Sequence, residues 1–397
     1  MTSSFNTQLM LRLDEVTRTP NQKTCTEYFA GIGLVRLGLE RAGWETVFAN
    51  DWSPEKLEMY SAYFKESKHQ YALKDVFELC PGEIPPSLLA TASFPCIDLS
   101  LAGNLDGIAG QYSSAFWGFV NVLKNQKSKP LLVMLENVAG WLTSNKGQDF
   151  RVTIEALNQV GYACDVLAID AARFVPQSRP RVFVIGVRAD APSHDISAFL
   201  KRDASLKTKA LCRAVESNTD LVWRFLDVPP LPQRSSLTLK DIVERMLESD
   251  IRWWEQSEVD RHVNMMSAIN SAYLDELKQQ PKYSYRTVYR RIRAGHQRAE
   301  IRKDDIAGCL RTAKGGSSRQ ILVRAGKGGV RMRLLTPREY ARLQGVPDDY
   351  PLPTRANQAL NGFGDAVCVP VITWIGQSVL NPLLDCESIA PLLKLHS

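Results

Sequence analysis

The sequence predicts a doubly wound α/β domain built on a mostly parallel sheet, together with a second, smaller domain. Strand-like and helix-like segments alternate over residues 24–188, which is the pattern of a parallel sheet covered by helices on both faces. The alternation stops after Arg188, and a proline-rich turn segment, VPPLPQ, follows at 228–233. Regular patterning resumes at residue 333, and a chain of 397 residues is long enough for two cores.

The elements of the first domain can be placed in chain order. Strands are expected at TCTEYFA, ETVFAND, LLATASF, KPLLVMLENV, YACDVLAID and RPRVFVIGVR. Helices are expected at LVRLGLERAG, PEKLEMYSAYF, SAFWGFVNVLKN and FRVTIEALNQVGY, the second of which carries proline at an early position, as helices prefer. The continuous apolar run KPLLVMLENV is typical of a central strand that is buried on both faces.

The second domain is predicted to contain a helix at LKDIVERMLES and then a basic region. Between Lys282 and Arg342 the chain has 17 Lys and Arg but only 4 Asp and Glu, whereas the net charge of the whole chain is +6. A charge run is usually a solvated surface. Arginine-rich segments interrupted by glycine also suit phosphate and base-edge contacts, and this favours nucleic-acid binding.

These patterns divide the chain into four parts. They are an N-terminal extension at 1–22, a first domain at 23–190, a second domain at 191–330, and a segment at 331–397 that returns to the first domain. The final helical stretch, NQALNGFGDAVCVPVITWIGQSVL, has an apolar face that is expected to pack on the first domain.

The composition disfavours several classes of protein. None of the eight cysteines is spaced as C-x-x-C or paired with a nearby histidine, so we expect free thiols and no metal site. The five histidines are scattered and give little support to histidine-centred catalysis. The sequence has no apolar run of about 18 residues and no secretory leader, so we expect a cytoplasmic protein.

Residues that could hold a ligand follow the first strands. The segment Phe29–Gly33 (FAGIG) opens a helix, where glycines let the backbone approach a ligand closely. Asp51 ends the second strand, where an acid grips ribose hydroxyls in doubly wound nucleoside sites. Asp75 adds a third polar group at this sheet edge. Taken alone, each of the two acids is more typical of a helix N-cap or a turn. Asp51 and the glycines together make a nucleoside site as well supported as those structural roles.

Reactive groups follow the next strands. Cys96 is either a small buried hydrophobe or a nucleophile whose thiolate a helix N-terminus or a cation would favour. Glu136 ends an apolar run on the same edge and is equally typical of a structural hydrogen-bonding group. Arg179 and Arg181 alternate with the strand period and are expected to share a face. Near Cys96 they would stabilise a thiolate and an anionic adduct; elsewhere they would be solvated surface cations.

Six motifs occur in order between residue 24 and about residue 380. They are FAGIG (29–33), FPC (94–96), ENV (136–138), QSRPR (177–181), RLLTPREYARLQGVPDDY (333–350) and GDAV (364–367). In this order the chain resembles the DNA (cytosine-5)-methyltransferase family of the bacterial restriction-modification type. The resemblance implies an S-adenosylmethionine-dependent methyltransferase fold, with a target-recognition domain in the region 191–330.

The resemblance also implies catalytic roles. Cys96 would attack C6 of a cytosine that has been flipped out of duplex DNA, and C5 would then accept the methyl group. Glu136 would hold or protonate N3 of the base, and Arg179 would contact the base with support from Arg181. S-adenosyl-L-methionine would be the cofactor. The residues matched to its site are Phe29, Gly31, Gly33, Asp51, Trp52, Asp75, Val76, Phe94, Pro95, Asp365, Ala366 and Val367.

The chain departs from the family pattern at three positions. Ile97 stands where glutamine is common, Leu99 where an aromatic residue is usual, and Asp365 where the late motif usually has asparagine. A carboxylate at position 365 would oppose formation of the Cys96 thiolate unless the carboxylate is paired or points away.

Two other functions are retained as hypotheses. An RNA methyltransferase similar to the tRNA-modifying branch would share the catalytic centre, but the long region between Arg188 and Arg331 favours DNA. A non-catalytic, methyltransferase-like scaffold is disfavoured because the cysteine and glutamate motifs are both intact.

The partners follow from the same resemblance. We expect a monomer that binds double-stranded DNA and acts either beside a separate restriction endonuclease of the same specificity or as an orphan methylase. The target sequence cannot be predicted. The residues expected to contact DNA are Arg311, Lys314, Gly315, Gly316, Arg319 and Gln320.

Overall fold

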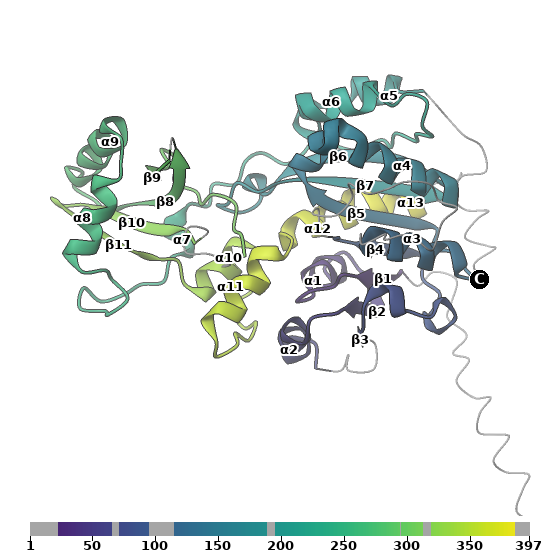
Figure 1. The fold of residues 1–397 in the computed structure, drawn as a ribbon, viewed down its shortest axis with the longest axis horizontal. Helices are drawn as coiled ribbons and strands as arrows, with labels where there is room; N and C mark the ends of the chain where they lie inside the picture. Colours follow the sequence, from purple (N-terminus) through teal and green to yellow (C-terminus); the bar gives the residue numbers. More distant parts are fainter. Residues whose placement is uncertain are drawn as a thin grey trace, which may run out of the picture.

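The computed structural model describes residues 23–65, 71–94, 115–188, 195–293, 295–312 and 319–385. These residues form a large domain around a seven-stranded sheet and a small domain around a four-stranded sheet. The two domains lie side by side along the long axis of the molecule (Figure 1). The predicted α/β fold is confirmed.

The large sheet has the strand order β3-β2-β1-β4-β5-β7-β6. Its strands are β1 (Thr24–Tyr28), β2 (Glu45–Asp51), β3 (Tyr71–Leu73), β4 (Leu89–Ala92), β5 (Leu132–Val138), β6 (Tyr162–Asp170) and β7 (Pro180–Arg188). Neighbouring strands are parallel except at β7, which runs antiparallel to β5 and β6. Val138 pairs with Arg181, so the start of β7 meets the carboxyl end of β5 at the edge where ligands bind in such folds.

Helices cover both faces of this sheet, as a doubly wound fold requires. The first four are α1 (Leu34–Glu40), α2 (Pro54–Tyr63), α3 (Ala115–Asn125) and α4 (Gln148–Val160). Side chains of α1 and α2 enter one apolar cluster, and those of α3 and α4 enter a second. β4 is buried along its whole length, and β5 along all but its last residue. Short 3₁₀ segments follow the strands at η2 (Val76–Glu78), η3 (Pro81–Glu83), η5 (Ala139–Gly147) and η6 (Ala171–Arg173).

Residues 197–226 pack on the large domain, although the sequence predicts that the second domain starts at residue 191. This segment contains α5 (Ser197–Lys201), η7 (Ala204–Leu206) and α6 (Lys209–Glu216). Trp223 is fully buried in the cluster under α3 and α4. The guanidinium of Arg202 forms a buried ion pair of 2.6 Å with Asp165 of β6. Burying these groups fixes the segment against the sheet.

The small domain has its own apolar core. The strand order of its antiparallel sheet is β11-β10-β8-β9, with β8 (Ser284–Arg293), β9 (His296–Ile301), β10 (Ile321–Gly326) and β11 (Gly329–Leu334). Helices α8 (Gln256–Asn264) and α9 (Ala268–Lys278) pack on this sheet. The helix predicted at LKDIVERMLES is limited to the four residues of α7 (Leu239–Ile242). Because β11 belongs to this sheet, the small domain ends near residue 334.

After β11 the chain packs again on the large domain. The returning elements are α10 (Pro337–Leu343), α11 (Ala356–Asp365), α12 (Val369–Ile375), η8 (Gly376–Leu380) and α13 (Asn381–Leu384). α12 packs directly on α1: a Cβ atom at Gly38 would lie 2.5 Å from Cβ of Ile372. Thr373 also donates a hydrogen bond to the Gly38 carbonyl at 3.1 Å.

One returning helical stretch is as long and apolar as a membrane span, although the sequence predicts none. Ala356–Leu384 could cross a membrane by length and composition alone, and 56% of its most apolar window is buried inside the protein. Core helices of globular proteins pass the same test, and here Ile372 and Ile375 belong to the main apolar cluster. The stretch is therefore weak evidence for a span.

Glu27 of β1 is expected to make the protein less stable as pH rises from about 4.5 to about 8. The side chain is fully buried, and neither carboxylate oxygen has a hydrogen-bond partner. Burial raises the pKa of the Glu27 carboxyl to about 8, although nearby Arg36 partly opposes this. Across this window the unfolded chain has lost the proton and the folded chain keeps it, so stability falls by up to about 1.4 kcal/mol per pH unit.

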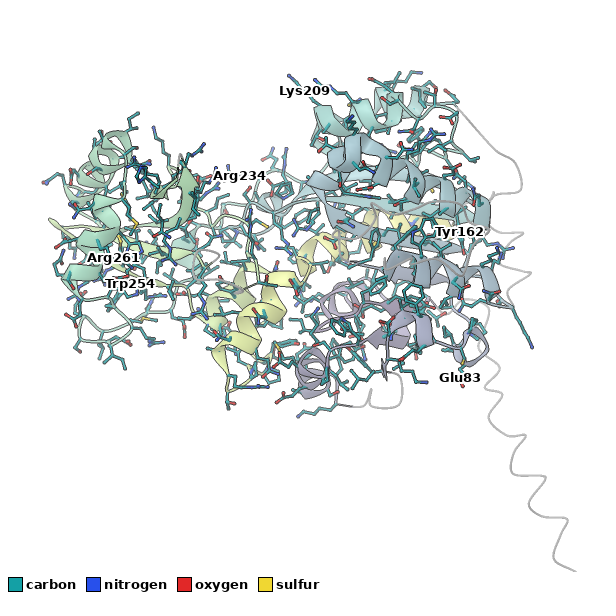
Figure 2. All side chains as sticks on the ribbon, viewed as in Figure 1. Glu83, Tyr162, Lys209, Arg234, Trp254 and Arg261 are labelled. Atoms are coloured by element: carbon teal, nitrogen blue, oxygen red, sulfur yellow. The ribbon has the colours of Figure 1, made fainter. Side chains whose placement is uncertain are left out.

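Urea unfolding of the Glu27→Gln variant at several pH values tests this expectation. The variant should lose the pH slope and exceed the wild type in stability at pH 8. Glu83→Gln, at an exposed position of the large domain (Figure 2), is the matched control and should retain the slope. A slope that survives in Glu27→Gln would contradict the assignment.

Candidate active site

The turn after β1 has a backbone that favours glycine. Gly31 and Gly33 have φ values of +57° and +80°, and Phe29 also lies in the left-handed region at +56°. A Cβ atom at Gly33 would lie only 2.5 Å from the Phe64 ring, so no larger residue fits there. At Gly31 the nearest atoms would be 3.9 Å away, which is an ordinary van der Waals distance, so that side of the turn is less crowded.

Asp51 lies beside this turn at the end of β2. Its side chain is buried, and its two oxygens accept hydrogen bonds from the backbone N–H groups of Gly31 at 2.9 Å and Ser53 at 3.0 Å. Each oxygen has a second lone pair for a ligand hydroxyl. Trp52, the next residue, is 73% exposed. An indole that is so exposed beside a buried carboxylate is available for stacking.

The third predicted pair occupies the neighbouring strand end. Asp75 caps η2, because its Oδ1 accepts a hydrogen bond from the N–H of Phe77 at 3.0 Å. Val76 is buried, and a Cβ atom at Gly118 would lie 2.5 Å from its Cγ1. Asp75 therefore has the N-cap role that the sequence offered as the alternative to ligand binding, and Val76 packs beneath α3.

Phe94 and Asn137 meet at the carboxyl ends of β4 and β5. The side chain of Asn137 donates a hydrogen bond to the Phe94 carbonyl at 3.3 Å, which fixes the residue before Pro95 against the residue that follows Glu136. Pro95 and Cys96 lie outside the described residues, as do Ile97 and Leu99.

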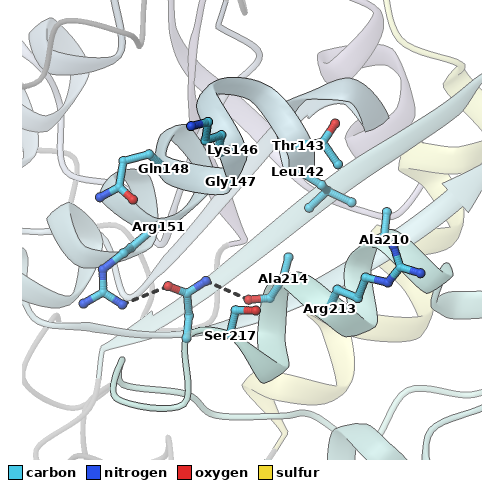
Figure 3. Close-up of a pocket in the computed structure, with 11 residues that line it drawn as sticks. Leu142, Thr143, Lys146, Gly147, Gln148, Arg151, Ala210, Arg213, Ala214 and Ser217 are labelled. Atoms are coloured by element: carbon cyan, nitrogen blue, oxygen red, sulfur yellow. Dashed lines mark hydrogen bonds between the residues drawn. The ribbon is translucent and has the colours of Figure 1, made fainter.

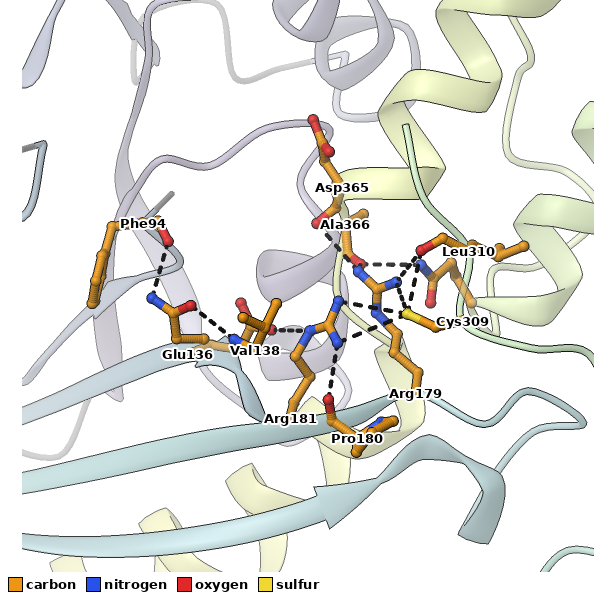
Figure 4. Close-up of polar contacts among 12 residues, drawn as sticks. Phe94, Glu136, Val138, Arg179, Pro180, Arg181, Cys309, Leu310, Asp365 and Ala366 are labelled. Carbon is orange, nitrogen blue, oxygen red and sulfur yellow. Dashed lines mark hydrogen bonds and ion pairs between the residues drawn. The ribbon is translucent and has the colours of Figure 1, made fainter. Parts of the chain in front are cut away.

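The two arginines of QSRPR have different surroundings (Figure 4). Nε of Arg181 lies 2.9 Å from Oε1 of Glu136, and both side chains are nearly buried. Arg179 is buried and donates hydrogen bonds to four backbone carbonyls, those of Leu310 at 2.9 Å, Gly364 at 3.2 Å, Asp365 at 3.4 Å and Ala366 at 2.6 Å. Burial, and then the charge of Arg181, lowers the pKa of Arg179. The structure therefore places Arg181, not Arg179, against the glutamate.

The two arginines point to the same side of the chain, as the sequence predicts, since both guanidinium groups lie within 3.9 Å of Sγ of Cys309. β7 begins at Pro180, and Arg179 directly precedes the strand. Its backbone N–H donates a hydrogen bond to Oδ1 of Asp170 at 2.7 Å. Although the two side chains share a side, Arg179 reaches the carbonyls of the late motif and Arg181 reaches Glu136.

Three residues of this site have no predicted role. Sγ of Cys309 lies 3.4 Å from Nη1 of Arg179 and 3.9 Å from both terminal nitrogens of Arg181. Gln177 accepts a hydrogen bond from the N–H of Leu310 at 3.0 Å and donates one to the Leu343 carbonyl at 2.8 Å. Gln344 donates to the carbonyls of Phe363 at 2.6 Å and Ala366 at 3.0 Å. Gln177 and Gln344 lie within the quoted motifs QSRPR and RLLTPREYARLQGVPDDY, which could have drawn attention to them, whereas Cys309 lies in none of the six motifs.

The late motif closes this arrangement. A Cβ atom at Gly364 would lie 2.4 Å from the carbonyl oxygen of Arg311, so glycine is required for this close approach. Val367 is buried, and Asp365 is exposed with its carboxylate pointing away from Arg179 (Figure 4). The carboxylate is also paired, since its Oδ2 lies 3.6 Å from Nζ of Lys56.

The residues predicted to contact DNA have different environments. Gln320 is buried and bonds to the backbone of its own segment, accepting from the N–H of Gly308 at 3.0 Å and donating to the Cys309 carbonyl at 3.2 Å. It is therefore not available to a base edge. Arg311 is exposed, and Arg319 bonds to the side chain of Asn357. Lys314, Gly315 and Gly316 lie outside the described residues.

The hairpin of β8 and β9 carries exposed cations that the predicted set omits. Arg291 and Arg293 have half or more of their side chains exposed, and Ile292 between them is 79% exposed. Glu300 of β9 pairs with both arginines, at 3.5 Å and 3.1 Å. Alternation of Arg and exposed Ile in RRIR was the sequence signal for this surface.

A separate hollow lies on the flank of the large domain (Figure 3). It has a volume of about 500 Å³ and is lined by Leu142, Thr143, Lys146, Gly147, Gln148, Arg151, Ala210, Arg213, Ala214, Ser217 and Asn218. Arg151 donates a hydrogen bond to Asn218 at 2.8 Å within it. None of the predicted site residues lines this hollow.

Comparison with known proteins agrees with the motifs. The model of the C-5 cytosine-specific DNA methylase family matches residues 24–381. The Type II methyltransferase M.BsuFI of Bacillus subtilis is 27% identical over 367 residues, which cover 92% of this chain and 74% of that protein. The Type II methyltransferase M.NgoBI of Neisseria gonorrhoeae is 26% identical over 347 residues, which cover 87% and 89% of the two chains.

Two solved structures share the fold. The Dnmt2 methyltransferase of S. pombe superposes with a TM-score of 0.56 at 17% identity, covering 91% of this chain and 99% of that chain. The methyltransferase EhMeth of Entamoeba histolytica gives a TM-score of 0.57 at 14% identity and the same coverage. The family match spans both domains and all six motifs, and the chain therefore belongs to the C-5 cytosine-specific DNA methylase family and is a DNA (cytosine-5)-methyltransferase.

Proposed function

We propose that this enzyme transfers a methyl group from S-adenosylmethionine to C5 of a cytosine flipped out of a specific double-stranded DNA sequence, through a covalent adduct between Cys96 and C6. The observation that supports it most directly is the pair formed by Glu136 and Arg181, beside the segment that leads to Cys96. The family model that matches the chain is that of C-5 cytosine-specific DNA methylases, and the relatives are named Type II methyltransferases.

The residues after β1 and β2 fit the methyl donor by the chemistry of their groups. Asp51 can accept hydrogen bonds from ribose hydroxyls, Trp52 can stack on adenine, and the absence of a side chain at Gly31 favours close approach of a ligand to the backbone. When bound, the donor supplies an electrophilic methyl group on a sulfonium. Asp75, Val76, Phe94, Pro95, Ala366 and Val367 complete the proposed site.

The steps at the base follow from the chain's own residues. The Cys96 thiolate attacks C6, so a carbon–sulfur bond forms and electron density moves to C5. Glu136 holds N3, and Arg181 keeps that carboxyl in place and donates to the base as negative charge develops. C5 takes the methyl group as S-adenosylhomocysteine leaves. A water molecule then removes the proton from C5, and the freed electron pair re-forms the C5–C6 double bond and expels the Cys96 thiolate. Arg179 supports these steps by fixing the late motif.

Labelled S-adenosylmethionine tests the proposal directly. Incubation with duplex DNA should place label on C5 of cytosine at one sequence, and incubation with tRNA should not. Cys96→Ala should abolish labelling, with Cys80→Ala, an exposed cysteine, as the control. Label on tRNA alone, or N6-methyladenine alone, would overturn the proposal. Bisulfite sequencing of DNA from expressing cells would give the target sequence.

We also propose that the β8–β9 hairpin contacts DNA phosphates, alongside Arg311 and Arg319. Replacing both Arg291 and Arg293 with alanine should weaken binding to all sequences and reduce the slope of log K against log salt by about 2, since each phosphate contact contributes about 0.9. Fluorescence anisotropy at several salt concentrations measures this. Arg261→Ala, on the outer flank of the small domain (Figure 2), should leave the slope unchanged. An unchanged slope in the double variant would contradict a role for the hairpin.

A further inference from the structure

Lys56 of α2 lies between two carboxylates from distant parts of the chain. Its Nζ is 4.0 Å from Oδ2 of Asp51, at the end of β2, and 3.6 Å from Oδ2 of Asp365, at the end of α11. Asp51 is nearly fully buried, and Lys56 is about a quarter exposed. Since the same Asp51 oxygen accepts the hydrogen bond from Gly31, the cation acts on the carboxylate that faces the glycine turn.

The stem of Lys56 also borders that turn. The atom nearest to a Cβ built on Gly31 is Cδ of Lys56, at 3.9 Å. The stem of Lys56 therefore lies beside Gly31, and its charged end lies beside Asp51. Both features place it next to the groups that fit a nucleoside.

Asp365 joins Lys56 to the other half of the active site. The backbone carbonyls of Gly364, Asp365 and Ala366 accept hydrogen bonds from Arg179 at 3.2, 3.4 and 2.6 Å, respectively. Its side chain points away from that arginine toward Lys56. A continuous series of polar contacts thus connects Arg179, Asp365, Lys56 and Asp51.

We propose that Lys56 is a positioning residue for the methyl donor. It would position the donor by offsetting the negative charges of Asp51 and Asp365, both of which lie beside its Nζ. The inference rests on the proposed function. Without the cation, two like charges would lie close together beside the proposed donor site, because both carboxylates lie within 4.0 Å of the same Nζ. A lysine at 56 is therefore needed because residue 365 is an aspartate.

The pair predicts a specific pattern of double-variant effects. Lys56→Met should weaken binding of S-adenosylhomocysteine about tenfold or more, and Asp365→Asn should change it less than threefold. The double variant should return to within threefold of the wild type, because the charge that needed compensation is gone. In turnover, the loss in Lys56→Met should be in KM for S-adenosylmethionine more than in kcat.

The same two helices supply a matched control. Arg355, the N-cap of α11, pairs with Glu55 of α2 at 3.4 Å, but both side chains are more than half exposed. Arg355→Met removes an ion pair between the same elements and should leave the dissociation constant within twofold of the wild type.

Calorimetry of S-adenosylhomocysteine binding to the full chain separates the outcomes. If the wild type binds and Lys56→Met binds equally well, or if the double variant is as weak as Lys56→Met, the role of Lys56 is overturned and the proposed function stands. If the wild type does not bind S-adenosylhomocysteine, the proposed donor is overturned, and this inference fails with it. Thermal unfolding of each variant confirms that it is folded.

Discussion

Arg181→Ala should lower kcat for methylation by about 10²–10³-fold and should cost the protein less stability than the loss of Arg179. Arg181 is the group whose nitrogen lies 2.9 Å from the Glu136 carboxylate. Its remaining contacts are to the neighbouring Pro180 carbonyl and, at 3.9 Å, to Sγ of Cys309. Removal should leave the glutamate without a fixed cation and the developing charge on the base without a donor.

Single-turnover rates and urea unfolding of the same preparations test this result. Arg181→Lys is the informative control: it keeps the charge and loses the planar fork, so it should recover only part of the rate. A variant Arg181→Ala with near-normal turnover would show that the ion pair to Glu136 is structural. A loss of stability as large as that expected for Arg179 would also contradict the assignment.

The strands, the glycine turn and the six motifs could be predicted because each depends on local sequence. The apolar run of β5 is compatible with few structures other than a central strand. Glycine is required at position 33 because Tyr60 of α2 and Phe64 at its end leave no room for a Cβ atom. The family motifs then identified Glu136 and the arginines before any contact was known.

What the sequence could not predict depends on contacts between distant segments. Gln320 is polar and follows a glycine-containing turn, which suggested a base contact. It is buried because the backbone groups of Gly308 and Cys309 need partners inside the protein. The assignment of residues 197–226 to the large domain likewise rests on Trp223 and on the ion pair between Arg202 and Asp165. No local pattern reports either pairing.

The two arginines of QSRPR show the same limit most clearly. Their spacing predicted a shared face, and the family resemblance gave the base contact to Arg179 with support from Arg181. The two side chains do share a side and both contact Cys309, but Arg181 bonds to the glutamate and Arg179 bonds to the late motif. The sequence contains both residues of the site but does not show which distant group each one reaches.

Arg179→Met is therefore expected to destabilise the protein by about 3 kcal/mol or more, since each buried carbonyl left without a donor costs about 1–3 kcal/mol. The carbonyls of Leu310, Gly364 and Asp365 would lose the Arg179 donor, and that of Ala366 would keep only the bond from Gln344. Urea unfolding followed by tryptophan fluorescence measures the change. Gly364→Ala is a second test variant, because its Cβ would clash with the Arg311 carbonyl. It would push the late motif away from the segment that contains Leu310 and Arg311 without removing any charge.

The comparison of Arg179→Met with Arg181→Ala decides between two accounts of the motif. If Arg179 anchors the late motif, its variant should unfold at lower urea, and Gly364→Ala should shift in the same direction. Activity would then fall because the segment carrying Asp365 and Ala366 is no longer held. If Arg179 contacts the base instead, Arg179→Met should unfold like the wild type and lose only turnover. Because the wild-type guanidinium is already surrounded by backbone carbonyls, we expect the first result.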